Sequence, residues 1–514
     1  MSGTTGCGKS ELLAWLVHHG TQTGTPTERA VHAVVPSAGQ SLSGTAWSLA
    51  TQLGLVARSP DELLKALTHD TRRTVIVLTD LHDDPTADLA FNLSRIPHVR
   101  VIVESRTGSP AHQRLSETGC AELDLDLERW RDPQRFEQWQ ATHPGSEQAA
   151  ASQHPAVNLS DPAAVCDADP WLVTAAYETN TLADHGGLQA AWFRAGQALN
   201  SAESAASRAL TLLSVLGDRA DPRYAPVLAD MSSGTGWRLQ WSRVSGDIAP
   251  PWPGPVTALT TGQGPLADCL LTAGVDGTVK AVRAKDATAH GRVTVIGSPL
   301  TAMTVLPDGT VLYLADDGTL RSEPAWAKRP ERSGIEGLLD TPTHAQRLAG
   351  LLQGQRSTAL AHTPGASLGT LALGDITGTV RTVGDVSASA SLHHGAVTSL
   401  AAISLPRADG TPTPLIYSGG ADGSVNMWSP GRAPMDGALT QRSSAVVSLD
   451  AVVTEYGPAT AVAWADGLVE WTEWESGRQQ TLRPGPPVRA VALDVEGRLF
   501  IGMDEATTCL TSFA

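Results

Sequence analysis

A repeated hairpin unit in the second half of the chain most constrains how it can fold. Between residues 255 and 514, a short apolar strand, a tight turn and a further strand recur at intervals of roughly 40 to 60 residues. Asp-Gly and Thr-Gly pairs occupy the turns, where glycine accepts the positive φ that such hairpins need. Each unit is too small for its own core, and radial closure protects strand edges, so we predict a β-propeller of about six to seven blades. The first strands begin at Val256, Leu300, Ser357, Val397, Val446 and Val488.

Two further segments determine how the ring closes and how many blades it has. Residues 236–244 alternate like a strand, and we expect them to pair with the last unit and close the ring. Residues 328–355 hold either a seventh unit or an insertion. Solitary aspartates in the turns lack the D-x-D-x-D density of a calcium site, so we interpret them as turn residues. These are Asp276, Asp317, Asp422 and Asp466.

The start of the chain carries a different signal, the string GTTGCGKS at residues 3–10. It fits the phosphate-binding loop G-x-x-x-x-G-K-[ST], in which glycines let backbone N–H groups surround a phosphate. We expect Lys9 to reach the β- and γ-phosphates of ATP or ADP and Ser10 to bind Mg²⁺, while the helix that follows directs its dipole at the same anion. The predicted nucleotide-binding residues are Gly3, Thr4, Thr5, Gly6, Cys7, Gly8, Lys9, Ser10 and Glu11.

Strands and helices alternate over the first 130 residues, as a doubly wound α/β sheet requires. The predicted strands cover residues 30–36, 74–80 and 99–106, and residues 121–127 are predicted to form a half-exposed edge strand. Ser59 is a predicted helix N-cap, because proline follows it and Glu62 lies three residues on.

A phosphate-binding loop of this kind follows a parallel strand, yet only Met1 and Ser2 precede Gly3. We therefore expect the strand either to lie upstream, in a longer chain, or to be lost from the sheet. Its expected place is central, between strand 74–80 and strand 99–106. Its loss would leave buried backbone groups of both neighbours unpaired, at a cost of about 1–3 kcal/mol each.

Charged residues at the ends of two predicted strands complete the candidate site. Asp80 ends the second strand and is the candidate Mg²⁺ ligand opposite the Ser10 hydroxyl. Arg106 follows the third strand, next to the expected γ-phosphate, and the family resemblance given below implies that Asp83 polarises an attacking water molecule. Asp83 and Arg106 are thus the candidate catalytic residues.

These segments resemble the STAND class of signalling ATPases, which are relatives of the NACHT modules. The resemblance rests on GTTGCGKSELL, on VIVLTDLHDD and on VIVESRTG, where Arg106 matches the arginine that follows the fourth strand of the class. It implies that ADP holds a closed inactive state, that ATP permits opening and self-oligomerisation, and that Arg106 senses the γ-phosphate.

The acidic strand end departs from the pattern of this class. Aligned on Leu81, Thr79 replaces the metal-binding acid, and His82 occupies the first of two further acid positions. Alternatively Asp80 takes the metal role after a one-residue shift, which would point it to the opposite face of the strand. Nucleotide binding is therefore favoured over rapid hydrolysis, and a slow ATPase activity remains open.

The second half resembles WD-repeat propellers, most clearly at HHGAVTSL and YSGGADGSVNMW. In that unit His393 or His394, Asp422 and Trp428 stand at the positions of the family's structural hydrogen-bond network. Most other units lack the terminal tryptophan. The resemblance implies that a protein partner binds on one face of the ring.

The region between these parts has the composition of a linker over residues 143–168 and helical patterns over residues 169–233. Pro170 stands in the first turn of one predicted helix, and Asn200 with Glu203 is the predicted cap of another. Trp192 and Phe193 are predicted core residues. In the STAND class a helical lid follows the sheet, so the region resembles that lid; the alternative is a set of helices that only connects two domains. Its Asp169-Pro170-Trp171 vaguely resembles the G-x-P nucleotide sensor of the class, without the glycine.

Composition excludes some classes of function. The formal net charge of −16 argues against nucleic acid as the main partner, because such surfaces are usually basic. No apolar run reaches the roughly 18 residues that a membrane span needs. The five cysteines are scattered and read as reduced thiols of a cytoplasmic protein.

The predicted organisation is a nucleotide-binding domain over residues 1–142, a linker, a helical lid, and a propeller over residues 234–514. The predicted function is an ATP- or ADP-binding signalling switch, in which the propeller senses or docks a protein partner and regulates opening. The alternatives are a non-enzymatic propeller scaffold with a vestigial nucleotide module, and the sensor half of a longer effector protein.

Overall fold

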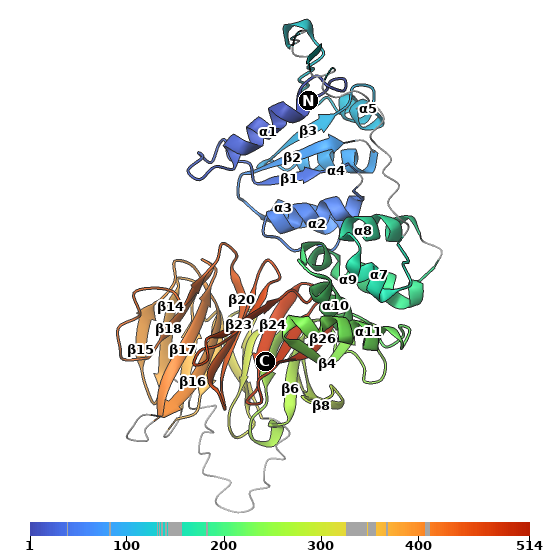
Figure 1. The fold of residues 1–514 in the computed structure, drawn as a ribbon. Coiled ribbons are helices and arrows are strands. Elements are labelled where there is room, and N and C mark those ends of the chain that lie inside the picture. Colours follow the sequence, from blue (N-terminus) through green and yellow to red (C-terminus); the bar gives the residue numbers. More distant parts are fainter. Residues whose placement is uncertain are drawn as a thin grey trace, which may run out of the picture. The chain divides into compact units, whose positions relative to one another are not determined.

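The chain divides into two compact units, Met1–Ser201 and Ala202–Ala514, in its computed structural model (Figure 1). This division lies within the helical region that the sequence predicts to be a single lid. The described residues are 1–130, 157–324, 356–406 and 412–513, apart from gaps at 39, 82–83, 181–182 and 366–368, with a few single positions between these ranges.

The first unit is built on a parallel sheet with the strand order β1-β2-β3. Strand β2 is apolar on both faces, since Ile76 and Leu78 belong to the core that contains α2, α3 and α4, whereas Val77 packs with α1. The predicted α/β unit with a parallel sheet is therefore confirmed. Its elements are α1 (Lys9–Gly20), β1 (Ala33–Pro36), α2 (Leu42–Gln52), α3 (Pro60–His69), β2 (Thr74–Leu81), α4 (Asp84–Ser94), β3 (Val99–Ser105) and α5 (Pro110–Glu117).

Met1 and Ser2, the short segment that precedes the loop before α1, form backbone hydrogen bonds with β3 and with Leu123. The amino group of Met1 donates to Val103 O at 2.8 Å, and Ser2 N donates to Leu123 O at 3.0 Å. Ser2 and Asp124 form a parallel bridge. The predicted place between β2 and β3 is wrong, because those two strands pair directly and satisfy each other's backbone groups. The segment lies on the other side of β3.

The remaining elements of this unit follow the sequence signals with two exceptions. The Ser59 side chain accepts from Glu62 N and caps α3, as predicted. The edge strand predicted over residues 121–127 is only the single bridge at Asp124. Within the region predicted to be a linker, residues 162–167 form a short helix whose N-cap is Asp161.

Three helices follow in the first unit, and two of them pack against α2. Pro170 stands in the first turn of the second, as predicted, and Trp192 is fully buried. Gly196 lies so close to the Trp47 indole that a Cβ atom there would clash, which fixes the approach of these helices. The helices are α7 (Pro162–Asp167), α8 (Pro170–Thr179) and α9 (Leu188–Ser201).

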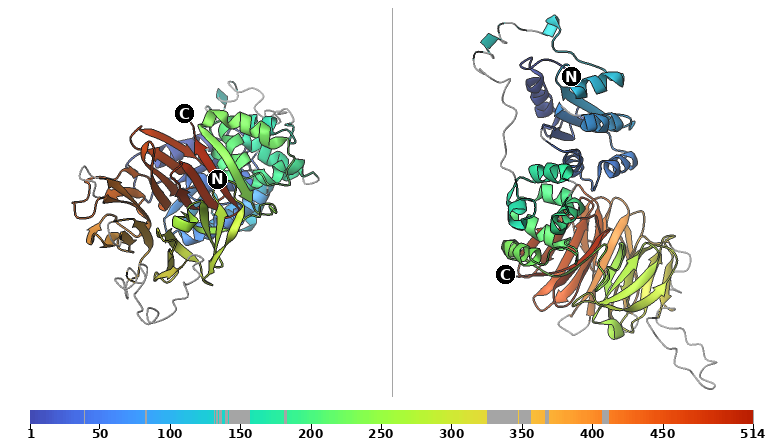
Figure 2. Two further views of the ribbon diagram at one scale, coloured as in Figure 1. Left: turned by 90° about the horizontal axis from the view of Figure 1, so that it is seen from below. Right: turned by 90° about the vertical axis from the view of Figure 1, so that its right-hand side faces the viewer.

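The second unit begins with α10 (Ala205–Ser214) and α11 (Tyr224–Met231). Asn200 does not cap α10 as predicted, because it lies inside α9. The cap is Ser204, whose hydroxyl accepts from Ser207 N at 3.1 Å and whose backbone is extended. Six sheets follow and form a six-bladed β-propeller (Figures 1 and 2).

The first strand of each blade lies next to the first strands of the neighbouring blades, so that the ring closes. The first blade consists of β5 (Val256–Thr261), β6 (Cys269–Gly274), β7 (Thr278–Arg283) and β8 (Ala289–Val295), and the second of β9 (Leu300–Val305), β10 (Val311–Ala315) and β11 (Leu320–Glu323). The third consists of β12 (Ala359–Thr363), β13 (Thr370–Gly374), β14 (Thr379–Gly384) and β15 (Ala388–Ser391), and the fourth of β16 (Val397–Pro406), β17 (Pro412–Gly420), β18 (Ser424–Trp428) and β19 (Thr440–Gln441). The fifth consists of β20 (Val446–Thr454), β21 (Gly457–Trp464), β22 (Val469–Glu473) and β23 (Arg478–Leu482), and the sixth of β24 (Val488–Leu493), β25 (Arg498–Met503), β26 (Ala506–Ser512) and β4 (Trp237–Val244).

The closure of the ring agrees with the sequence prediction. Strand β4 pairs antiparallel with β26, so a strand from the start of the unit completes the last blade. The segment 328–355, predicted to be a seventh unit or an insertion, lies outside the described residues except for residue 347. No helix in the described part of the chain is both long and apolar enough to cross a membrane.

The turn aspartates of the propeller serve the backbone, as predicted. Asp276, Asp317 and Asp422 each accept from the N–H two residues further on, at 2.9–3.0 Å. Among the residues that the structure describes, no group of three or more His, Cys, Asp or Glu side chains could hold a metal ion.

Candidate functional site

The loop before α1 has the backbone form that its glycines predict. Gly8 is the N-cap of α1 with φ 90°, a left-handed conformation that residues with a side chain rarely adopt. The space where its Cβ would lie is open. Lys9 and Ser10 therefore form the first turn of a 12-residue helix whose N-terminal N–H groups lie beside the loop.

The Lys9 amine is held by the loop itself. Its Nζ donates to Gly3 O at 2.8 Å and to Thr4 O at 2.9 Å, and it lies 3.7 Å from the Cys7 sulfur. The lysine thus crosses from the start of the helix to the start of the loop. A cation held in this way lies where an anion bound in the loop would be neutralised.

The Ser10 hydroxyl contacts a carboxylate from the neighbouring strand. Ser10 Oγ donates to Glu104 Oε1 at 2.8 Å, and Glu104 is 4% exposed near the end of β3. Glu104 is not among the site residues that the sequence predicts. The signal that marks it is its place near the carboxyl end of a strand beside the loop.

A second acid, Asp126, fastens the loop and was missed by the sequence analysis. Its carboxylate accepts from Thr4 N at 2.9 Å and 3.1 Å, from Thr4 Oγ1 at 2.8 Å and from Thr107 Oγ1 at 3.2 Å. Asp126 thereby links the loop to the segments after β3 and after α5. Its alternating surroundings in the sequence gave no sign of this contact.

The other predicted site residues are less closely grouped. Asp80 is exposed, has φ 55°, and lies where the pairing of β2 with β3 shifts register between Leu78 and Leu81. Such an irregularity can turn a side chain toward a new direction, which is what a one-residue shift of the metal ligand requires. Arg106 is exposed directly after β3, and Asp83, like His82, lies outside the described residues.

The rest of the loop presents small and polar groups. Thr5 and Gly6 lie in the turn of the loop, Gly6 with φ 84°, and Cys7 is a half-buried free thiol. Glu11 is exposed in the first turn of α1. The predicted nucleotide-binding residues thus form one continuous loop and helix start.

The hydrogen-bond network predicted in the propeller is present in part. His393 Nδ1 lies 3.2 Å from Asp422 Oδ1 and 2.8 Å from Ser424 Oγ, and His393 Nε2 lies 2.9 Å from Ser418 Oγ. Burial lowers the pKa of His393. Burial opposes the charge on Asp422, but hydrogen bonds from Ser424, from the His394 N–H and from His393 lower its pKa to about 2.

Trp428 does not join this network, contrary to the prediction. Its Nε1 donates to Arg432 O at 2.9 Å, because a turn in which Arg432 N donates to Ser429 O brings this carbonyl within reach. The network ties β18 to the segment that precedes β16, and it stabilises one blade rather than forming a reactive site.

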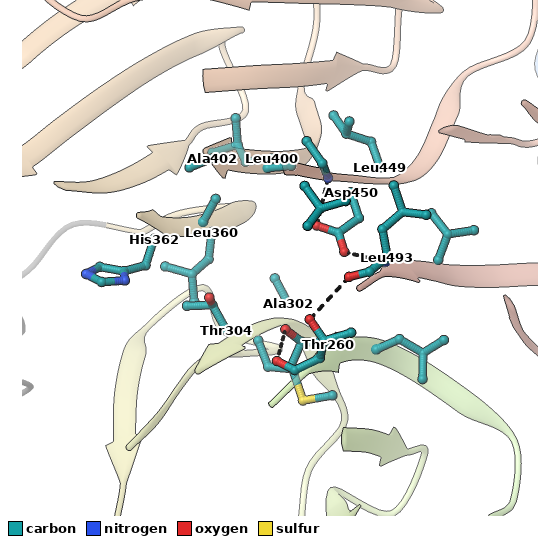
Figure 3. A pocket seen from close by; sticks show the side chains of 18 of the residues that line it. Thr260, Ala302, Thr304, Leu360, His362, Leu400, Ala402, Leu449, Asp450 and Leu493 are labelled. Atoms are coloured by element: carbon teal, nitrogen blue, oxygen red, sulfur yellow. Dashed lines mark hydrogen bonds between the residues drawn. The ribbon is translucent and has the colours of Figure 1, made fainter. Parts of the chain in front are cut away.

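A cavity of about 650 Å³ lies between the first strands of the propeller blades (Figure 3). Leucine, alanine, threonine and serine side chains form most of its wall, and His362 and Asp450 also line it (Figure 3). Asp450 Oδ1 accepts from Ala451 N at 2.9 Å and Oδ2 from Leu493 N at 2.8 Å. Burial raises the pKa of this carboxyl group to about 6.

No protein-family model matches the chain, and no curated protein is similar to it in sequence. A similar solved structure is that of the computationally designed Ika8 protein, at 18% identity, covering 50% of this chain and 71% of that chain with a TM-score of 0.30. A likeness this distant carries no argument about function. The assignment of six blades rests on the pairing of the strands.

Proposed function

We propose that this protein binds ATP or ADP with Mg²⁺ at the loop of residues 3–10, and that its propeller docks a protein partner whose binding depends on the nucleotide. The observation that carries the nucleotide part is the meeting of three groups at one place. Gly8 leaves open space beside the backbone at the start of α1. Lys9 and Ser10 provide an amine and a hydroxyl group on the first turn of this helix, beside the sheet.

This set of groups fits a phosphate chain. Backbone N–H groups at a helix N-terminus and a lysine amine both favour an anion, and no side chain fills the space at Gly8. Lys9 would exchange its bonds to the loop carbonyls for bonds to phosphate oxygens. A lone pair of Ser10 Oγ would bind the metal ion while its O–H still donates to Glu104, and Asp80 is the candidate second ligand.

Mg²⁺ supplies charge neutralisation of the phosphates when it is bound. Glu104 would remain beside Ser10 and orient its hydroxyl. Arg106, exposed after β3, would contact the γ-phosphate, and Asp83 would orient a water molecule. In this proposal ATP favours self-association, and hydrolysis of ATP is slow or absent.

Titration with a fluorescent ADP analogue in the presence of Mg²⁺ tests the nucleotide part. Lys9→Ala removes the amine, and we expect affinity to fall about ten- to a hundredfold, because hydrogen bonds to charged groups contribute about 1.5–3 kcal/mol. The matched control is Lys65→Ala, since Lys65 is exposed on α3 and its side chain lies on another element. Equal affinity of Lys9→Ala and Lys65→Ala would exclude the loop as the binding site.

The second candidate function is a propeller scaffold whose first unit has no nucleotide role. The observation that favours it is that the loop satisfies its own groups, with Lys9 bonded to Gly3 O and Thr4 O. In that case Lys9 stabilises the loop, and Lys9→Ala lowers the stability of the first unit without changing any ADP titration. The same two variants therefore separate the two candidates.

A further inference from the structure

Several polar side chains of the propeller's inner strands connect one blade to the next. Ser399 Oγ accepts from Leu449 N at 2.8 Å, and Ser448 Oγ accepts from Val491 N at 3.0 Å. Asp450 follows the same pattern through Leu493 N on the next blade. Unlike the serines, Asp450 brings a charge to this position, and neutral N–H donors do not balance it.

The other charged groups that line the cavity are paired. Arg489 contacts the Asp504 carboxylate at 2.7 Å and 2.9 Å, and Asp494 contacts Arg498 at 2.5 Å. Among the described residues that line the cavity, Asp450 is the acid for which the structure records no ion pair. Among its described lining residues, the cavity therefore has one acid, Asp450, without a recorded cationic partner.

We propose that this cavity binds the guanidinium group of an arginine side chain from a protein partner, with Asp450 as its counter-ion. Each oxygen of Asp450 already accepts one N–H and keeps a free lone pair, so a planar group with several N–H donors suits it. A guanidinium is also more weakly hydrated than an ammonium, which lowers the cost of entering a largely protein-lined cavity.

Size and charge agree with such a ligand. A cavity of about 650 Å³ accommodates a long side chain, and the leucine and alanine walls suit its methylene groups. The chain's net charge of −16 favours the approach of a cation. Burial raises the pKa of Asp450 to about 6, which reflects the cost of an unbalanced charge that a bound cation would offset.

The inference rests on the docking role proposed for the propeller and not on nucleotide binding. It is tested on the full chain, without nucleotide, by calorimetric titration with N-acetylarginine amide at pH 7.5. The neutral isostere N-acetylcitrulline amide is titrated in parallel. We expect the arginine probe to bind at least about tenfold more tightly than the citrulline probe, since it alone carries the positive charge.

Asp450→Asn removes the charge with little change in shape, and we expect it to reduce arginine affinity about tenfold. Asp436→Asn is the matched control, because Asp436 is exposed and does not line the cavity. Equal binding of the two probes, absence of arginine binding at 10 mM or below, or an equal effect of the two variants would overturn the proposal. The comparison of probes on the unaltered chain keeps the test valid if Asp450→Asn folds poorly.

Failure of this site and failure of the docking role are distinguishable. A partner that binds the propeller equally well in the Asp450→Asn variant would leave docking intact and contradict the arginine site alone.

Discussion

The two units of this chain use polar groups in opposite ways. In the first unit they gather at one place, where Lys9 and Ser10 of α1, Glu104 of β3 and Asp126 from the segment after α5 meet around a single loop. In the propeller they are distributed, and side chains of β16 and β20 make similar contacts with the next blade. Polar groups that converge from several elements are typical of a ligand site, whereas polar contacts that are repeated from blade to blade stabilise the ring.

The difference also teaches how to recognise a site inside a repeat. In a regular ring a contact that recurs from blade to blade is structural. A residue that keeps the contact but adds a feature that the others lack is then informative. Asp450 is such a residue, since it bonds to Leu493 N as Ser448 bonds to Val491 N but carries a charge.

The largest expected effect concerns closure of the ring. Trp237 lies on the closing strand β4, is 1% exposed and packs against Trp471 with ring centroids 6.1 Å apart. We expect Trp237→Ala to destabilise the second unit by about 3–5 kcal/mol, because it leaves a cavity where the ring is joined. Scanning calorimetry of the full chain measures this loss.

Trp474→Ala is the control for that variant, since Trp474 is 38% exposed and its loss is expected to cost less than about 1 kcal/mol. The transition of the first unit should stay unchanged in both. If Trp237→Ala shifted the unfolding transitions of both units together, the two units would unfold as one. That result would contradict the comparison of two separate units.

A smaller effect is expected from the His393 network. Asp422 has a pKa lowered from 3.8 to about 2, so its carboxylate contributes stability that is present above pH 3.8 and is lost as the pH falls toward 2. We expect Asp422→Asn to cost about 2 kcal/mol at pH 7, from 1.36 kcal/mol per pKa unit, and progressively less below pH 4. Denaturant unfolding at pH 7 and pH 3 measures this difference.

Asp276→Asn sharpens that test. Asp276 occupies a similar turn, where it accepts from Thr278 N and Thr278 Oγ1, but no histidine is recorded among its contacts in the described residues. Its substitution should cost less than that of Asp422. Equal costs would mean that the turn alone, and not the histidine network, stabilises this blade.

Much of the fold follows from local sequence signals. The Asp-Gly turns, the six first strands and the closing strand β4 are all recognisable, because glycine turns and alternation are local properties. The sequence predicts that the strand before the loop lies between β2 and β3, whereas Ser2 lies on the other side of β3. The order of parallel strands depends on long crossover connections, which local sequence patterns do not encode. The cap of α10 was misplaced because Asn200 and Ser204 are both good caps, and packing of α9 decided between them.

The part of the candidate site that is contiguous in the sequence was predictable. Lys9 and Ser10 follow from one motif, and the structure places both on the first turn of α1. Glu104 and Asp126 reach the loop from residues about 100 positions away, through pairing that no single-sequence pattern reveals. Asp450 was not predictable either, because its meaning depends on the closed ring around it.

Hydrogen–deuterium exchange of the full chain, with and without Mg²⁺ and ADP, tests the central claim most directly. The account predicts slower exchange, by about tenfold or more, in peptides that cover residues 3–12 and 103–107, because bound phosphate would fix the loop and its neighbouring strand end. The same peptides in Lys9→Ala should show no change on adding nucleotide. Exchange at residues 3–12 that is unaffected by nucleotide in the unaltered chain would contradict the account.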